Sequence, residues 1–290
     1  MSKALLRNYP YVMLLPGCLV FLVFFIVPTL QGVYYSFTNW NGFEASWVGF
    51  DNFISFFQDR DLSKIVKNTL VFTAVTTFFK VGLGIAAAVF LNRKLKTKYF
   101  LQTVIFSPAI LSNVAVGLMF VAILHPEAGL VNKLLNGLGL DFLAMDWLHD
   151  RRLALYGASS VEIWKWTGFN MVILLAGLQT IPRDFYEAAD TAGASAWQKF
   201  RHITLPLLMP AINNVLVLNL IGGLKVFDMI AVTTNGGPGT ATEVINTWIY
   251  KAYGSGLLGQ SSAGSVVLAV LVTLVSLSTY YVLRKREVEL

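Results

Sequence analysis

The chain has 290 residues, of which 56% are hydrophobic and only 13% are charged. A water-soluble domain with so few polar residues could not cover its surface, so this composition excludes an ordinary soluble protein and predicts a membrane protein. The formal net charge is +6, but the basic residues lie in short groups between apolar stretches, which argues against nucleic-acid binding. One cysteine and three widely separated histidines give neither a disulfide framework nor a metal-binding motif.

Six apolar stretches are long enough to cross a bilayer as helices. A hydrocarbon core of roughly 30 Å needs about 20 apolar residues per helix, because each backbone amide must be satisfied within its own segment. The first stretch follows Lys3 and Arg7 as in a signal peptide, but it is too long and lacks a cleavage site, so we expect a retained helix. The expected spans of this all-α membrane protein are residues 11–36, 68–91, 101–124, 154–178, 206–233 and 262–284.

Several of these spans contain residues that disturb an apolar helix. Glu162 and Lys165 lie near the start of the fourth span, and Pro108 in the third removes a backbone donor and predicts a kink. Lys225 and Asp228 in the fifth span are three residues apart, a helical spacing at which opposite charges neutralise each other. Lys80 in the second span is expected to snorkel or to pair with a partner subunit.

The basic residues predict the orientation of the spans. With six spans and the N-terminus inside, the cytoplasmic segments are the two tails and the loops near residues 92–100 and 179–205. These segments carry twelve lysines and arginines, against seven on the other side. Positive residues collect on the cytoplasmic side of membrane proteins, so we predict that both termini are cytoplasmic.

Residues 181–210, between the fourth and fifth spans, are expected to form two short helices. Pro182 suits a first helical turn, and Gly193 can supply the left-handed end of the first helix. Ser195 followed by Gln198 is a capping-box pattern that starts a second helix. The pattern alone favours an ordinary loop at the membrane interface over a knob that binds another protein.

The residues of this segment resemble the EAA loop of binding-protein-dependent importer permeases. The matching positions are Glu187-Ala188-Ala189, Gly193-Ala194, Phe200, Ile203, Leu205-Pro206 and Pro210. A second block resembles the outer loop of the first permease of carbohydrate importers, the maltose and glycerol-3-phosphate type. It comprises Phe227-Asp228, Thr234 to Gly239, Ala241-Thr242-Glu243 and Tyr250.

The resemblance implies the type I ABC importer permease fold. Its core domain would be residues 67–284, preceded by a tail, first helix and outer loop at 1–66 and followed by a cytoplasmic tail at 285–290. The EAA loop at 181–206 would couple the permease to a cytoplasmic ATPase. The implied coupling residues are Glu187, Ala188, Ala189, Gly193 and Pro206.

The resemblance also implies the partners of the chain. They are a second permease subunit in a heterodimer, a cytoplasmic ATPase dimer, an extracellular or periplasmic solute-binding protein, a sugar and the lipids of a bacterial cytoplasmic membrane. The chain has no GxxxxGK[ST] sequence, so ATP and Mg²⁺ are expected on the ATPase. We therefore expect a multi-pass transporter subunit without catalytic residues, bound metal or cofactor, and not an enzyme.

Polar and aromatic residues within the spans are candidates for a sugar path, because polar groups in a membrane usually face a cavity or the bundle interior. Amides and carboxylates beside an aromatic ring suit sugar hydroxyls and ring faces. The candidates are Asn113, Glu162, Trp166, Phe169, Asn170, Asn219 and Lys225. The resemblance places the positions matching the first four near the substrate of maltose-type permeases. Each candidate could instead make an ordinary hydrogen bond between helices.

Other functions predict other patterns. A permease for glycerol-3-phosphate or another polyol phosphate favours convergent arginines, but none lies in the interior of an expected span, so we favour an uncharged oligosaccharide or glycoside. A stand-alone secondary transporter favours an inverted repeat, and a membrane-embedded enzyme favours clustered His, Asp or Glu. Neither pattern is found in the sequence.

Overall fold

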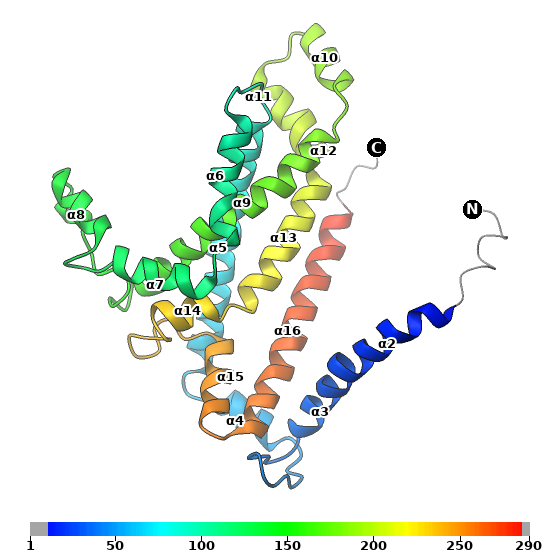
Figure 1. Ribbon diagram of the computed structural model, residues 1–290, viewed down its shortest axis with the longest axis vertical. Coiled ribbons are helices and arrows are strands. Elements are labelled where there is room, and N and C mark those ends of the chain that lie inside the picture. The colour runs from blue at the N-terminus through cyan, green and yellow to red at the C-terminus, as the bar shows by residue number, and fades with distance from the viewer. Residues whose placement is uncertain (1–10, 286–290) are drawn as a thin grey trace. The chain divides into compact units, whose positions relative to one another are not determined.

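The computed structural model describes residues 11–285, and its elements are shown in Figure 1. Every regular element in this range is a helix, apart from an isolated bridge between Thr38 and Trp47. The chain divides into two compact units, one made of Met1–Asp59 and Ile249–Val267 and the other of Arg60–Trp248 and Leu268–Leu290. The all-helical prediction is confirmed for the described residues; the basic residues Lys3, Arg7 and Arg286 lie outside them.

The first unit contains the N-terminal apolar helix. The helix Leu15–Tyr35 has a mean hydropathy of 2.0 and comprises α2 (Leu15–Phe21), a π-helical turn (Leu22–Ile26) and α3 (Val27–Tyr35). Neither α2 nor α3 has a buried residue, as expected of a helix that lies against lipid or a partner subunit. After it, Asn52 of α4 (Asp51–Gln58) donates to the carbonyl oxygens of Ser36 and Thr38 at 2.9 and 2.7 Å.

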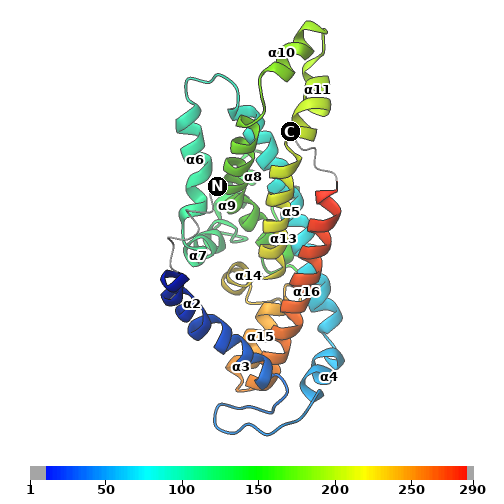
Figure 2. The same cartoon turned by 90° about the vertical axis from the view of Figure 1, so that its right-hand side faces the viewer.

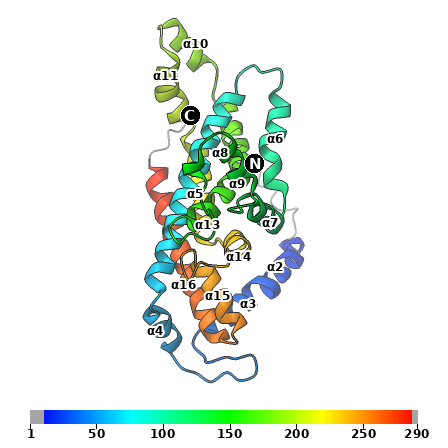
Figure 3. The ribbon, with the colours of Figure 1, turned by 90° about the vertical axis from the view of Figure 1, so that its left-hand side faces the viewer.

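The second unit is built on three long helices that pack against one another. They are α5 (Leu62–Leu91), α9 (Ala154–Gln179) and α13 (Met209–Leu224), which run side by side in Figure 1 and Figure 2. A fourth helix, α6 (Lys98–Ile110), packs along α9, as Figure 3 shows from another side. The shorter α-helices of this unit are α7 (Asn113–Ile123), α8 (Leu130–Gly137), α10 (Asp184–Thr191), α11 (Ala196–Lys199), α12 (Leu205–Leu207) and α14 (Asp228–Thr233). The last two helices, α15 (Ile245–Gly254) and α16 (Leu258–Arg284), each have residues in both units.

Glycines bring these helices into close contact. A Cβ atom on Gly84 of α5 would lie 3.0 Å from a side chain of α9, and one on Gly223 of α13 would lie 2.9 Å from the Cα of Thr73 in α5. On α9, a Cβ on Gly168 would lie only 2.0 Å from the carbonyl oxygen of Ile105 in α6. Small residues of this kind let helices in membranes pack backbone against backbone.

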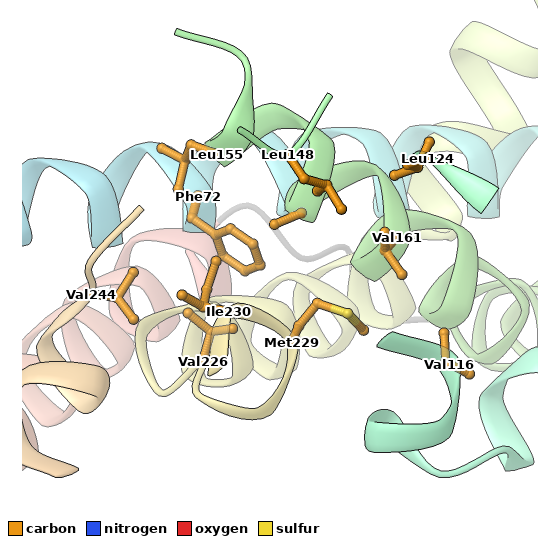
Figure 4. Packing of buried hydrophobic residues seen from close by; sticks show 11 residues of the cluster. Phe72, Val116, Leu124, Leu148, Leu155, Val161, Val226, Met229, Ile230 and Val244 are labelled. Atoms are coloured by element: carbon orange, nitrogen blue, oxygen red, sulfur yellow. The ribbon is translucent and has the colours of Figure 1, made fainter. Parts of the chain in front are cut away.

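Two apolar clusters lie at different heights along the α5–α9 pair. The first cluster, shown in Figure 4, joins Phe72 of α5 and Val161 of α9 to Ile230 and other residues of α14. The second joins later residues of both helices, from Val81 to Leu91 and from Met171 to Leu178, to α13. Lys80 of α5 and Glu162, Lys165 and Asn170 of α9 lie between these two clusters along their helices, so the apolar cores enclose these polar residues.

The expected spans are confirmed only in part. The helices Leu15–Tyr35, Leu62–Leu91 and Leu258–Arg284 are each long and apolar enough to cross a membrane, and two bent helix pairs raise the number to five if each pair counts as one span. Within the described residues, α9 is not among these candidates. It carries Glu162 and Lys165, which lower its hydropathy. Six spans with both termini in the cytoplasm therefore stay a prediction, as does the three-part domain division.

Two of the expected spans are discontinuous. The third was expected as one kinked helix, but α6 ends at Ile110 and α7 begins at Asn113 after a bend of 99°. The missing backbone donor of Pro108, in the last turn of α6, weakens the helix just before this break. The fifth span was expected to reach residue 233, but α13 ends at Leu224, after two glycines, and α14 begins at Asp228.

The expected pairing of Lys225 with Asp228 is therefore wrong. The two residues do not lie on successive turns of one helix, because the chain leaves the helical conformation between them. No ion pair joins them in the described structure. Asp228 instead lies in the first turn of α14, where a carboxylate is favoured by the helix dipole.

We predict that Gly168→Ala destabilises the fold, because the new methyl group would meet the α6 backbone. The expected loss is roughly 1–3 kcal/mol in the free energy of unfolding, the usual effect of overpacking a close contact, measured by thermal unfolding in detergent. Gly82→Ala is the matched control, since nothing lies within 4 Å of the added atom and alanine favours helix over glycine. Equal losses in the two variants would contradict the α6–α9 contact.

Candidate functional site

A cavity of about 420 Å³ lies in the second unit, between α5, α9 and α13 and the first turns of α7 and α14. Its polar and aromatic lining comprises Lys80, Asn113, Glu162, Trp166, Phe169, Asn170, Asn219, Lys225 and Asp228, and its apolar lining includes Ile173, Val215 and Leu218. All seven residues that the sequence proposed for a sugar path thus line one cavity. Their role in transport stays a prediction.

A buried ion pair joins α5 to α9 at this cavity. The ammonium nitrogen of Lys80 lies 3.4 Å from a carboxylate oxygen of Glu162, and the two side chains are only 3% and 12% exposed. The sequence predicted that Lys80 would snorkel or pair with another subunit, and this prediction is wrong. Its partner is on the neighbouring helix of the same chain, because the polar positions of α5 and α9 face each other between the two apolar clusters.

A second polar contact joins the two short helices. The side-chain amide of Asn113, the first residue of α7, donates to a carboxylate oxygen of Asp228, the first residue of α14, at 2.8 Å. One turn further on, a Cβ atom on Gly117 would lie 2.8 Å from a methyl carbon of Val232, so the helices also pack closely. Sequence reasoning missed Asp228 as a lining residue because it assigned that carboxylate to Lys225.

The two buried asparagines link α9 to α13. Asn219 donates to the side-chain oxygen of Asn170 and also to the Val215 carbonyl at 2.8 Å, while Asn170 donates to the Trp166 carbonyl at 2.7 Å. The residues are 7% and 2% exposed. The hydrogen bond between α9 and α13 therefore explains the presence of both amides as well as a role in the cavity wall does.

The cavity offers both ring faces and balanced charge. Trp166 and Phe169 meet edge to face with their ring centres 5.8 Å apart, and Phe169 is 37% exposed. Two cationic side chains, Lys80 and Lys225, and two anionic ones, Glu162 and Asp228, line the space, so their formal charges cancel. The chemistry suits an uncharged molecule with hydroxyl groups around apolar faces. The described residues contain no cluster of His, Cys, Asp and Glu that could hold a metal ion.

The segment at residues 181–210 forms the two short helices predicted from the sequence. The first, α10, is followed by Gly193 with a left-handed backbone, φ +73°. Ser195 and Gln198 form the predicted capping box, with hydrogen bonds of 2.7 and 3.3 Å. Figure 2 shows α10 and α11 at one end of the second unit, beyond the ends of α9 and α13.

Contacts between its own residues hold this segment together, and several of its side chains are exposed. Lys199 forms an ion pair with Asp190, and the hydroxyl groups of Tyr186 and Thr204 lie 3.0 Å apart. Of the implied coupling residues, Glu187, Ala188 and Gly193 are exposed, whereas Ala189 and Pro206 are half-buried. Nothing lies within 4 Å of the position that a Cβ on Gly193 would take, so the turn is open to a close approach by another protein.

A second cavity lies beside this segment. It has a volume of about 990 Å³ and brings the loop after α5 next to the loop after α9. Five cationic residues line it, namely Arg93, Lys94, Lys96, Lys98 and Arg183, against the one carboxylate of Glu187. The two loops that were predicted to be cytoplasmic thus lie together and form a positively charged surface.

Comparison with known proteins establishes the family. The family of binding-protein-dependent transport system inner membrane components matches residues 80–288. The chain belongs to this family. Its relatives are transport components, so this permease is a transporter subunit and not an enzyme, and its all-helical fold is that of an ABC importer permease.

Relatives from several organisms cover almost the whole chain. The multiple sugar-binding transport system permease protein MsmF of Streptococcus mutans is 32% identical over 99% of both chains. The trehalose/maltose transport system permease protein MalF of Thermococcus litoralis is 35% identical over 90% of this chain and 89% of its own. A chain of a bacterial ABC transporter involved in the import of the acidic polysaccharide alginate superposes with a TM-score of 0.83, at 30% identity, over 95% of this chain and 94% of that one.

We predict that replacing one residue of the Lys80–Glu162 pair destabilises the permease more than replacing both. Lys80→Met and Glu162→Gln each leave one buried charge unpaired, which costs roughly 3–5 kcal/mol of unfolding free energy. The double variant should recover much of this loss. Thermal unfolding in detergent measures the effect, with Lys67→Met, an exposed lysine on the same helix, as the control. Additive losses in the double variant would contradict the pairing.

Proposed function

We propose that this permease forms half of the transmembrane path of an ATP-driven importer for an uncharged oligosaccharide or glycoside. The single observation that carries the proposal is the cavity, which gathers amides, paired carboxylates and two aromatic rings around balanced charge. The names of the relatives support a sugar: one belongs to a multiple sugar-binding transport system, one to a trehalose/maltose transport system and one to an arabinooligosaccharide transport system.

Each part of the cavity has a place in sugar binding. Trp166 and Phe169 would offer apolar ring faces to the C–H faces of a sugar, and Asn113 and Glu162 would bind hydroxyl groups. Asn170 and Asn219 would form the wall between α9 and α13, and Lys225, which is exposed, would lie at its edge. A polyol phosphate is the weaker candidate, because no arginine lines the cavity and its two lysines are balanced by two carboxylates.

The segment of α10 and α11 would couple this path to ATP hydrolysis. We infer that Glu187, Ala188, Ala189, Gly193 and Pro206 form the knob that seats in a cytoplasmic ATPase dimer, which would hold ATP and Mg²⁺. Support comes from the exposure of Glu187 and Gly193 and from the internal bracing of the segment, since a rigid knob transmits a rigid-body movement. The chain continues from α9 into this segment and from it into α13.

The other proposed partners are a second permease subunit and a solute-binding protein outside the membrane. A related alginate transporter has been solved in complex with a periplasmic protein that carries an alginate pentasaccharide. The proposed location is the bacterial cytoplasmic membrane, with six spans and both termini inside. The basic cavity shared by residues 92–98 and 178–187 supports this orientation, because it places two predicted cytoplasmic loops together.

We predict that Glu187→Ala uncouples ATP hydrolysis from transport. The permease, expressed with the other chains of its gene cluster, should co-purify with a second permease and an ATPase. Loss of one charge-assisted contact should reduce ATPase stimulation by the solute-binding protein and sugar by about tenfold or more. Glu127→Ala is the control. It removes an exposed carboxylate that lies outside residues 181–210, and it should behave as wild type. If wild type purifies alone and transports without ATP, the importer proposal fails.

We predict that Trp166→Leu weakens sugar binding, because the variant lacks the ring face that lines the cavity. The KM for uptake should rise about two- to tenfold. Trp164→Leu is the matched control on the same helix, since Trp164 does not line the cavity and packs on Phe120 instead. Uptake into vesicles is measured with maltose, trehalose, arabino-oligosaccharides and glycerol 3-phosphate. Equal effects of the two variants would place the sugar elsewhere.

A further inference from the structure

At the break between α6 and α7, the Leu111 amide donates to the Pro108 carbonyl at 3.3 Å, but in the described structure the Ala109 and Leu111 carbonyl groups have no backbone donor. Leu111 has an extended backbone, with φ −69° and ψ 150°, and α7 begins only at Asn113. The last carbonyl groups of a helix have no amide donors of their own. In a membrane protein such groups need a partner from elsewhere in the chain, because water does not reach them in the hydrocarbon region.

Lys165 of α9 supplies that partner. Its ammonium nitrogen donates to the carbonyl oxygens of Leu111 at 2.6 Å, Ala109 at 3.2 Å and Pro108 at 3.4 Å. An ammonium group has three donors and no acceptor, so these contacts use its full capacity. The residue is 1% exposed and its nitrogen lies 4.7 Å from the ring centre of Trp166.

The ammonium group of Lys165 lies at a helix end. The C-terminus of α6 carries the negative end of the helix dipole, which favours a cation. Glu162, the carboxylate one turn earlier on α9, makes its ion pair with Lys80. Lys80 and Lys165 are both buried lysines beside the same cavity, but Lys80 pairs with a carboxylate and Lys165 binds backbone carbonyl groups.

The contact lies directly before the start of α7. One turn after Lys165, Gly168 lets α6 lie directly against α9, since a Cβ there would come within 2.0 Å of the Ile105 carbonyl oxygen. The lysine then holds the chain at Leu111, two residues before Asn113. Asn113 lines the cavity and donates to Asp228 at 2.8 Å. Lys165 itself is not part of the cavity lining.

We infer that Lys165 is a positioning residue for substrate binding: by binding the carbonyl groups at the α6–α7 break, it holds Asn113 in its place in the cavity. The inference rests on the proposed function, since it takes Asn113 as a sugar contact. Loss of the ammonium group would remove this donor from the carbonyl oxygens of Ala109 and Leu111, and α7 would move to satisfy them. Asn113 would then leave its position although its own side chain is unchanged.

The first test measures uptake kinetics of the complete complex in vesicles, with the sugar from the panel above that wild type takes up. Lys165→Met should raise the KM about tenfold, the effect of roughly one lost hydrogen bond to a polar group, with a smaller change in maximal rate. Lys165→Arg keeps the donors and should restore much of the affinity. Lys133→Met, which removes an exposed lysine from α8, should behave as wild type.

A double-mutant cycle shows whether the effect passes through Asn113. If it does, Lys165→Met should add nothing to the KM of Asn113→Ala, because the displaced contact is already gone. If the increases in KM of the two single variants multiply in the double variant, the inference is overturned. So does a Lys165→Met complex that has a lower unfolding temperature but a wild-type KM, since that result assigns Lys165 a structural role alone.

A cross-linking test separates this inference from the proposed function. In a Cys18→Ser background, Gly117→Cys and Val232→Cys place two sulfur atoms between α7 and α14, where a Cβ on Gly117 lies 3.0 Å from that of Val232. Lys165→Met should slow disulfide formation by copper phenanthroline in membranes several-fold, and Lys165→Arg should restore it. Unchanged cross-linking overturns the inference even if no sugar of the panel is transported, whereas slowed cross-linking without sugar uptake refutes only the proposed function.

Discussion

The polar side chains of α9 are the constraint on which the rest of the second unit depends. Charged groups are costly in a hydrocarbon environment, so they must find partners inside the protein. Glu162 pairs with Lys80 of α5, Lys165 binds the end of α6, and Asn170 bonds to Asn219 of α13. Each of α5, α6 and α13 thus satisfies one polar group of α9, and the candidate cavity lies beside these contacts.

Broken helices shape that space further. Irregular backbone at membrane depth is tolerated only where protein buries it or where it lines a cavity. Both breaks meet this condition, because Lys165 donates to the Leu111 carbonyl after α6 and Asn246 donates to the Lys225 carbonyl after α13 at 2.7 Å. The two short helices that follow the breaks are joined by Asn113 and Asp228. They close one side of the cavity as a packed pair.

The connection between the cavity and the segment of α10 and α11 gives the proposed function its physical logic. The segment of α10 and α11 follows α9 and precedes α13, and both long helices line the cavity. A packed, braced segment passes a displacement on to the helices at its ends, as in other rigid-body transitions. Movement imposed by an ATPase at one end would therefore reach Trp166 and Asn219 directly through the backbone.

The sequence alone determined the all-helical membrane character, the two helices and capping box of residues 181–210, and seven of the residues that line the cavity. These features depend on local patterns: apolar length, capping residues and the cost of polar groups in spans. Tertiary structure alone decided that Lys80 meets Glu162, that Asp228 meets Asn113, and that Lys165 binds the α6 end. Hydropathy counts the polar residues of a helix but does not tell which neighbouring helix faces them. Likewise, Pro108 predicted a kink, whereas the 99° turn depends on contacts with α9 and α14 that lie far away in the sequence.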